Sequence, residues 1–115
     1  MTIRPSFPTV LVVESDDALR ATLLRDLRDL GYLVLAGRSE PEAVEIARVH
    51  SRPIHVLLTD DGESGLALAA TLHQYRPQMR VVFLTRYAAA CADGGSKSDL
   101  AVAKVRDLLE PPGMC

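Results

Sequence analysis

Five carboxylates lie in two short stretches of the chain, and this grouping is its strongest chemical signal. Glu14, Asp16 and Asp17 follow one apolar run, and Asp60 and Asp61 end or follow another. If the two runs are neighbouring strands, the carboxylates converge and repel one another unless a cation lies between them. Oxygen ligands without His or Cys nearby favour Mg²⁺ over zinc. The pattern therefore indicates a magnesium site formed by Glu14 and Asp60, with Asp16 as an alternative ligand.

A carboxylate beside Mg²⁺ can also attack a phosphoryl group and carry it as an acyl phosphate. Thr85, a hydroxyl at the end of a later apolar run, and Lys97 are candidates to bind the phosphoryl oxygens. The alternative is that the acids are surface charges and helix caps. That interpretation suits Asp16 and Asp17, because acids stabilise a helix N-terminus. It explains Asp60 less well, because Asp60 ends an apolar run.

The elements that must position these residues are short strands that alternate with helices. Apolar runs predict four strands buried on both faces, at residues 9–14, 32–36, 54–59 and 80–85. Leucine spacing and capping residues predict helices at residues 16–30, 39–50, 65–75 and 98–109, with a short helix at 88–92. Ser39-Glu40-Pro41-Glu42 has the pattern of a capping box with proline in the first turn, and Gly31 suits the end of the first helix.

This alternation predicts an α/β domain with a doubly wound parallel sheet. We expect the strand order 2-1-3-4, helices on both faces, and functional residues beyond the carboxyl ends of the strands. The expected organisation is an N-terminal arm at residues 1–8, one domain at 9–109 and a C-terminal tail at 110–115.

Composition argues against several other classes of protein. The chain has 115 residues, 48% hydrophobic and 24% charged, as in an ordinary globular domain. A net charge of −2 without a basic block argues against direct nucleic-acid binding, and no apolar run approaches a membrane span. Two cysteines outside a CxxC motif favour a reducing compartment, so we expect a cytoplasmic protein. The chain lacks a P-loop, a dinucleotide-binding glycine motif and a catalytic triad, so we do not expect an enzyme.

Several segments, in their order along the chain, resemble the receiver domains of bacterial response regulators. Residues 9–14 followed by 18–20 resemble the first strand and helix of that family. Residues 57–60 resemble its third strand, which ends on the phospho-accepting aspartate, and residues 81–85 its fourth strand with the switch hydroxyl. Residues 96–109 resemble its final helix.

The resemblance extends over residues 9–109 and implies a flavodoxin-like receiver fold with a function in two-component phosphorelay signalling. It implies that Asp60 accepts a phosphoryl group from a histidine kinase or phosphotransfer protein. Glu14 would then help to bind the metal ion, Thr85 would be the switch hydroxyl, and Lys97 would contact the phosphate. The resemblance does not identify the downstream protein partner.

The chain departs from the family pattern at three places. Receivers carry two acids after the first strand, but here Glu14 is followed by Ser15, so we expect weak Mg²⁺ binding. The loop after Asp60 lacks the usual Met-Pro and reaches its glycine, Gly65, early. The stretch from residue 85 to 97 is too short for the family's fourth helix and fifth strand. We therefore expect four clear strands, with the fifth missing or degenerate.

These departures leave two functions open: a phosphorylated receiver, or a pseudo-receiver that binds a partner protein without being phosphorylated. They also predict that residues 80–85 form an edge strand with an uncharged centre. Such edges recruit other strands. We expect a homodimer through this edge or the apolar surface beside it, the alternatives being that the last helix or the segment 87–98 covers the edge.

Overall fold

The computed structural model describes residues 8–60, 62–84 and 97–110, which form alternating strands and helices. The strands are β1 (Thr9–Val13), β2 (Leu33–Gly37), β3 (Val56–Asp60) and β4 (Arg80–Leu84). The helices are α1 (Asp17–Asp29), α2 (Glu40–Val49), α3 (Glu63–Tyr75) and α4 (Lys97–Leu109). Each of the first three strands leads directly into a helix, as a doubly wound fold requires. None of these described helices is long and apolar enough to cross a bilayer.

The strands form one parallel sheet in the order β2-β1-β3-β4, which confirms the predicted order. β1 lies between β2 and β3 and is buried along its whole length. An unbroken apolar run is stable in this position because helices cover both faces of a parallel sheet. β4 pairs with β3 and lies at one edge of the described sheet.

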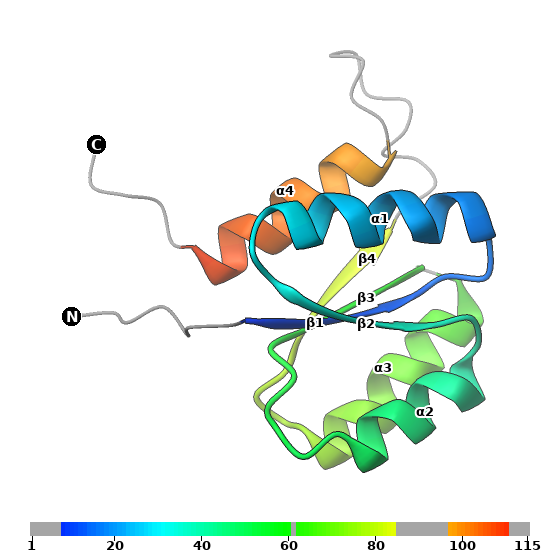
Figure 1. Ribbon diagram of the computed structural model, residues 1–115. Helices are drawn as coiled ribbons and strands as arrows, with labels where there is room; N and C mark the ends of the chain where they lie inside the picture. Colours follow the sequence, from blue (N-terminus) through cyan, green and yellow to red (C-terminus); the bar gives the residue numbers. More distant parts are fainter. Residues whose placement is uncertain (1–7, 61, 85–96, 111–115) are drawn as a thin grey trace.

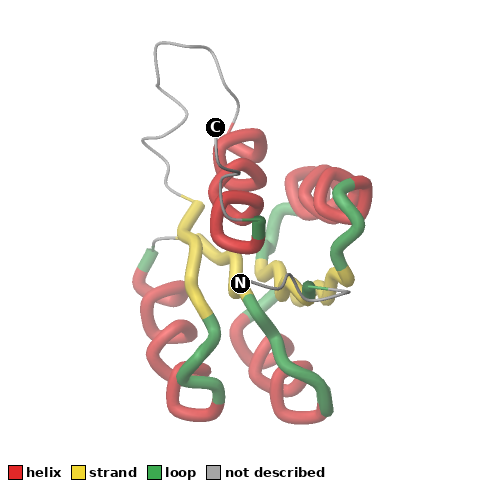
Figure 2. Tube along the Cα trace, turned by 90° about the vertical axis from the view of Figure 1, so that its left-hand side faces the viewer, coloured by secondary structure: helices red, strands yellow, loops and turns green. Residues whose placement is uncertain are grey.

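Two helices cover each face of the sheet, which confirms the prediction of helices on both faces. α1 and α4 lie on one face and α2 and α3 on the other (Figure 1), and the view along the layers in Figure 2 shows the strands between them. Successive side chains of β1 alternate between the two cores. Val10 and Val12 pack in the core shared with α1 and α4, whereas Leu11 and Val13 pack in the core shared with α2 and α3.

The helix ends follow the capping residues in the sequence. Asp16 caps α1, because its Oδ1 accepts the Leu19 N–H at 3.0 Å. Ser39 caps α2 by accepting the Glu42 N–H at 3.4 Å, but Glu42 itself accepts the N–H of Arg38 rather than that of Ser39. The predicted capping box is therefore formed in part.

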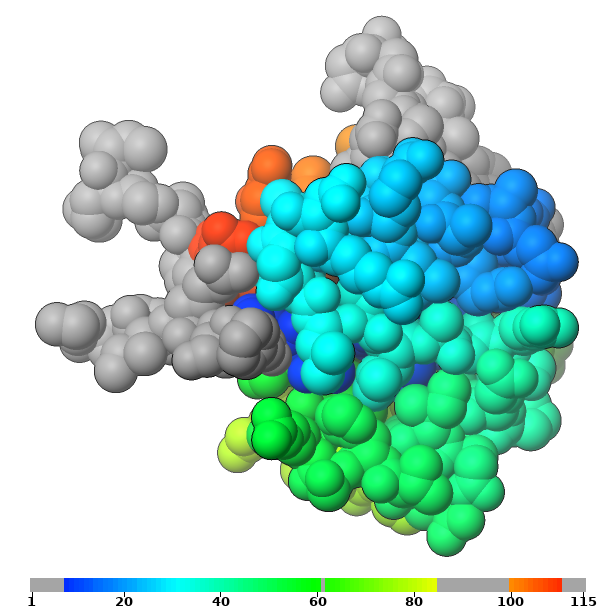
Figure 3. Space-filling model, viewed as in Figure 1, coloured from blue at the N-terminus to red at the C-terminus, as the bar shows by residue number. Residues whose placement is uncertain are grey.

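In the space-filling view, α1 and α2 flank the β2 edge (Figure 3).

The structure moves two predicted element starts by two residues, and the other boundaries by at most one. β3 begins at Val56, not at residue 54; Ile54 is buried like a strand residue but precedes the paired segment. α3 begins at Glu63, so Gly65 lies within its first turn rather than at its start. The predicted short helix at 88–92 and the site of a fifth strand lie outside the described residues. The same holds for residues 1–7 and 111–115, so the arm and tail remain predictions.

α4 packs on one face of β4. Ala101 and Val105 of the helix share a core with Val82 and Leu84 of the strand. The helix therefore covers that face of β4, while Val81 and Phe83 on the other side of the strand are only partly buried.

Candidate functional site

A cavity of about 360 Å³ lies at the carboxyl ends of β1 and β3. The register of these strands pairs Val12 with Leu58, and continuing it by two residues places Glu14 beside Asp60. Both acids line the cavity. The other polar residues of its lining are Ser15, Arg38, Ser39, Glu40, Thr59 and Ser64. The structure thus brings together the two acids that the sequence pattern predicts to lie side by side.

Glu14 is held firmly at the end of β1. It is only 9% exposed, and its Oε2 accepts the Asp16 N–H at 3.0 Å. Its own N–H donates to the Gly37 carbonyl at 3.1 Å, and Arg20 Nη1 donates to its carbonyl at 2.9 Å. These contacts fix both the backbone and the carboxylate of Glu14.

Arg20 connects this loop to the first turn of α1. Its second guanidinium nitrogen lies 2.6 Å from Asp17 Oδ1, and this hydrogen bond lowers the pKa of the Asp17 carboxyl. The Arg20 side chain is only 14% exposed, whereas that of Asp17 is 83% exposed. Asp17 is therefore committed to Arg20 rather than to the cavity.

Asp60 lies against the first turn of α3. Its Oδ1 accepts the Gly62 N–H at 2.9 Å, whereas no described residue donates a hydrogen bond to its Oδ2. A Cβ atom on Gly65 would lie 1.9 Å from the Asp60 carbonyl oxygen and 2.8 Å from Oδ1. Glycine at position 65 is therefore what allows α3 to begin so close to the Asp60 carboxylate.

Asp16 and Ser15, which follow Glu14, lie differently with respect to the cavity. Asp16 caps α1 through its carboxylate, as the alternative interpretation expects, and it does not line the cavity. Its role as a metal ligand stays a prediction. Ser15 does line the cavity. Among the described residues, no three His, Cys, Asp or Glu side chains lie close enough to hold a metal ion together.

The other candidate residues lie at the end of a described segment or outside the described residues. Asp61 and Thr85 lie outside the described residues, and Lys97 is described only as the first residue of α4. Two lining residues were not predicted from the sequence: Arg38, which follows β2, and Glu40, which begins α2. The available signal was their position, because residues after every strand of a doubly wound sheet reach the same end.

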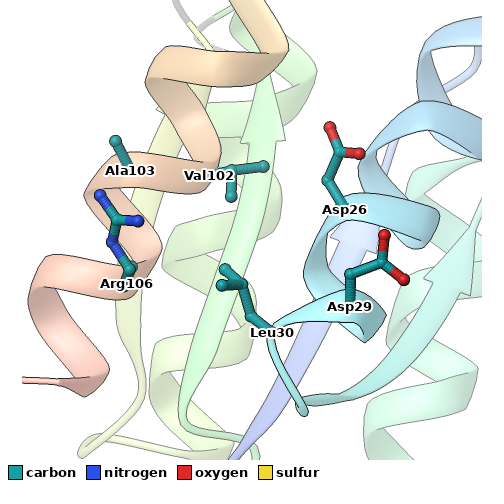
Figure 4. Close-up of a pocket in the computed structure, with 6 residues that line it drawn as sticks. All are labelled: Asp26, Asp29, Leu30, Val102, Ala103 and Arg106. Carbon is teal, nitrogen blue, oxygen red and sulfur yellow. The ribbon is translucent and has the colours of Figure 1, made fainter.

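Two further hollows lie away from Glu14 and Asp60. A groove of about 390 Å³ separates α1 from α4, with Asp26 and Asp29 on one side and Arg106 on the other (Figure 4). A hollow of about 420 Å³ at the opposite end of the sheet contains Arg52 and Arg76. The Arg76 guanidinium donates to three backbone carbonyls, those of Ala47, His50 and Arg52, so it holds α2 and α3 together.

Comparison with known proteins gives a consistent result for the fold. No family model and no curated protein matches the sequence. A CheY-like response regulator receiver domain from Methanospirillum hungatei JF-1 matches with a TM-score of 0.70 at 20% identity, over 91% of this chain and 95% of that one. A response regulator from Burkholderia pseudomallei, solved with a phosphorylated aspartic acid and a calcium ion, gives 0.66 at 23% identity, over 90% and 67%.

A third similar structure is the response regulator TrrA, solved in complex with the histidine kinase ThkA. It matches with a TM-score of 0.64 at 21% identity, over 90% of this chain and 100% of that one. At these identities the likeness concerns the fold. The chain has the CheY-like, flavodoxin-type fold of receiver domains, which confirms the fold that the sequence predicted.

Proposed function

We propose that this chain is a receiver module of two-component signalling in the cytoplasm, which accepts a phosphoryl group on Asp60 from a histidine kinase or phosphotransfer protein. The observation that carries the proposal is the placement of Asp60 and Glu14 in one cavity at the carboxyl end of a receiver-type sheet. Two proteins of similar fold support it, one with a phosphorylated aspartic acid and one bound to a histidine kinase.

In the proposed step, an Asp60 carboxylate oxygen forms a bond to phosphorus while the bond from phosphorus to the donor breaks. The leaving atom is nitrogen for a phosphohistidine and oxygen for acetyl phosphate, and it keeps the electron pair of the broken bond. The Gly62 N–H orients the carboxylate through Oδ1. Such orientation favours attack because the nucleophile is held in place before the donor arrives.

Glu14 and Asp60 would hold a divalent cation, because both are hard oxygen ligands in the same cavity. The fit is that of a weak site, since Ser15 replaces a charged ligand and the described residues contain no three-ligand cluster. A bound cation would neutralise part of the negative charge on the phosphoryl group. In this proposal Thr85 and Lys97 bind the phosphoryl oxygens, and phosphorylation biases a two-state equilibrium that a downstream protein reads.

The proposal is tested by intact-mass measurement after incubation with acetyl phosphate, with and without Mg²⁺. We expect the wild-type protein to gain one phosphoryl group, more rapidly with Mg²⁺, and Asp60→Asn to gain none. A wild-type protein that gains no mass, or an Asp60→Asn variant that gains as much, would contradict the proposal.

A pseudo-receiver is the second candidate, and a specific observation favours it. Ser15 occupies the cavity where receivers carry a second acid, which weakens the case for a metal-assisted reaction. Such a module would act through protein binding alone. It is distinguished by the same measurement, because a folded pseudo-receiver gains no phosphoryl group at any Mg²⁺ concentration.

A further inference from the structure

Arg38 lies at the cavity because of strand pairing. β2 pairs with β1 through Val13 and Gly37, and the Glu14 N–H donates to the Gly37 carbonyl at 3.1 Å. The residue after Gly37 is therefore carried to the same end of the sheet as Glu14. The Arg38 N–H donates to Glu42 Oε1 at 3.3 Å, which fixes the backbone just before α2, and the residue lines the cavity that contains Asp60.

Arg38 is the one cationic residue in the described lining, among three acids. Arg20 is nearby, but its guanidinium is committed to the Glu14 carbonyl and to Asp17. The Arg38 side chain is exposed and forms no ion pair with a described residue. Its guanidinium can therefore turn to a new anion without breaking an existing pair.

The charge of Arg38 already acts on this part of the molecule. The pKa of Asp17 is lowered first by its hydrogen bond with Arg20, and in smaller part by the charge of Arg38. The Arg38 guanidinium therefore acts on Asp17, the first residue of α1, which follows the loop that carries Glu14 and Ser15.

We infer that Arg38 is a phosphoryl-binding residue, whose guanidinium binds oxygens of the phosphoryl group on Asp60. The inference rests on the proposed function and deepens it. A planar guanidinium suits this role because two of its N–H groups can donate to two phosphoryl oxygens at once. A cation would bind only weakly to a site with Ser15 in place of an acid. Arg38 then supplies part of the positive charge that such a cation would otherwise provide.

A phosphoryl-binding role for Arg38 predicts how the rate of labelling depends on the Mg²⁺ concentration. If Arg38 neutralises the phosphoryl group, labelling should persist when Mg²⁺ is scarce and should fall when Arg38 is removed. Abundant Mg²⁺ should recover part of the loss, because the cation then supplies the missing charge. A residue with only a structural role would not change how the rate depends on Mg²⁺.

The test measures acetyl phosphate labelling by intact mass across a range of Mg²⁺ concentrations, for wild type, Arg38→Gln, Arg38→Lys and Arg52→Gln. Arg52 is an exposed arginine at the opposite end of the sheet, so its variant controls for the loss of one charge. At low Mg²⁺ we expect labelling of Arg38→Gln to be about tenfold slower than wild type, as for a lost charge-assisted hydrogen bond. Arg38→Lys should label at an intermediate rate, and Arg52→Gln at the wild-type rate.

Circular dichroism melts of each variant establish that the comparison is made between folded proteins. If wild type and Arg38→Gln label at the same rate with the same Mg²⁺ dependence, the role of Arg38 is contradicted while the proposed function stands. If wild type is not labelled at all, the proposed function fails, and the inference fails with it.

Discussion

At the scale of single residues, the candidate site depends on a glycine as much as on its acids. Gly65 lies in the first turn of α3, where a Cβ atom would lie 1.9 Å from the Asp60 carbonyl oxygen. The atom in the way belongs to the backbone, so no side-chain rotation relieves the clash. The close approach of α3 is what places the Gly62 N–H within 2.9 Å of the Asp60 carboxylate.

Gly65→Ala should therefore destabilise the protein, although alanine is the better helix former. We expect the free energy of unfolding to fall by about 1–3 kcal/mol, the usual effect of forcing extra volume into a packed site. Urea unfolding measures it. The matched control is Gly37→Ala, because a Cβ atom there would meet its nearest neighbour at 3.4 Å, an ordinary contact. Equal stability of Gly65→Ala and wild type would show that α3 can move away from Asp60 at no cost.

Ser15 gives the second prediction at this scale. Ser15→Asp should bind Mg²⁺ more tightly than wild type, because the change adds a carboxylate to a cavity that already contains Glu14 and Asp60. Calorimetric titration measures the affinity, and Ser51→Asp, at an exposed position outside the cavity, controls for the added charge. Identical affinity of Ser15→Asp and wild type would mean that residue 15 does not occupy the ligand position.

At the scale of helices and strands, α2 and α3 are joined at the end opposite to the cavity. Arg76, which follows α3, donates to the carbonyls of Ala47 and His50 at the end of α2. His50 is the C-cap of α2, and its Nε2 is buried without a hydrogen-bond partner among the described residues. Burial lowers the pKa of His50, and the charges of Arg76 and Arg52 lower it further.

This arrangement predicts a loss of stability in mild acid. The pKa of His50 is about 6.5 in the unfolded chain and lower in the folded one, so the unfolded chain binds more protons as the pH falls. The free energy of unfolding should therefore decrease as the pH falls from about 6.5 towards the folded pKa, and should not depend on His50 above that range.

Urea unfolding of wild type and His50→Gln at about pH 7.5 and pH 5.5 checks this prediction. The variant should lose less stability than wild type between the two conditions, while His73→Gln, at an exposed position on α3, should lose as much as wild type. If His50→Gln and wild type lose the same amount, His50 is not responsible for the acid sensitivity.

The elements themselves were largely predictable from the sequence, because apolar runs and capping residues report directly on buried strands and helix starts. The errors have physical causes. Ile54 is apolar because it is buried, being 3% exposed, and it therefore looks like a strand residue in the sequence. It precedes β3, however, which begins at Val56. Gly65 was predicted to begin a helix, but it lies inside α3, where the absence of a side chain allows close contact with Asp60. Arg38 was missed because reasoning from converging acids gives no weight to a base after β2.

At the scale of the whole molecule, the edge of the sheet determines how the protein can associate. β4 has one strand partner, β3, in the described part of the chain. α4 covers the face of β4 that carries Val82 and Leu84, and this leaves the backbone edge of the strand unpaired by any described strand. Unpaired strand edges tend to recruit a second chain.

We therefore predict a homodimer that uses the β4 edge. Light scattering across a range of concentrations should show a dimer for wild type and a monomer for Phe83→Lys, because a charge beside the edge disfavours strand pairing. Val49→Lys places the same charge on an exposed apolar residue of α2 and should leave the dimer intact. A wild-type protein that is monomeric at every concentration would contradict the prediction and leave α4 as the cover of this strand.

The central claim, that Asp60 accepts the phosphoryl group, is tested most directly by locating the modified residue. Borohydride reduces an acyl phosphate to an alcohol, so treatment of the acetyl phosphate-labelled protein marks the acceptor permanently. Tandem mass spectrometry of peptides then distinguishes residue 60 from its neighbour Asp61 and from Glu14. We predict that the reduced side chain is found at position 60 alone. A mark on Asp61 or Glu14, or no mark at all, would contradict the account.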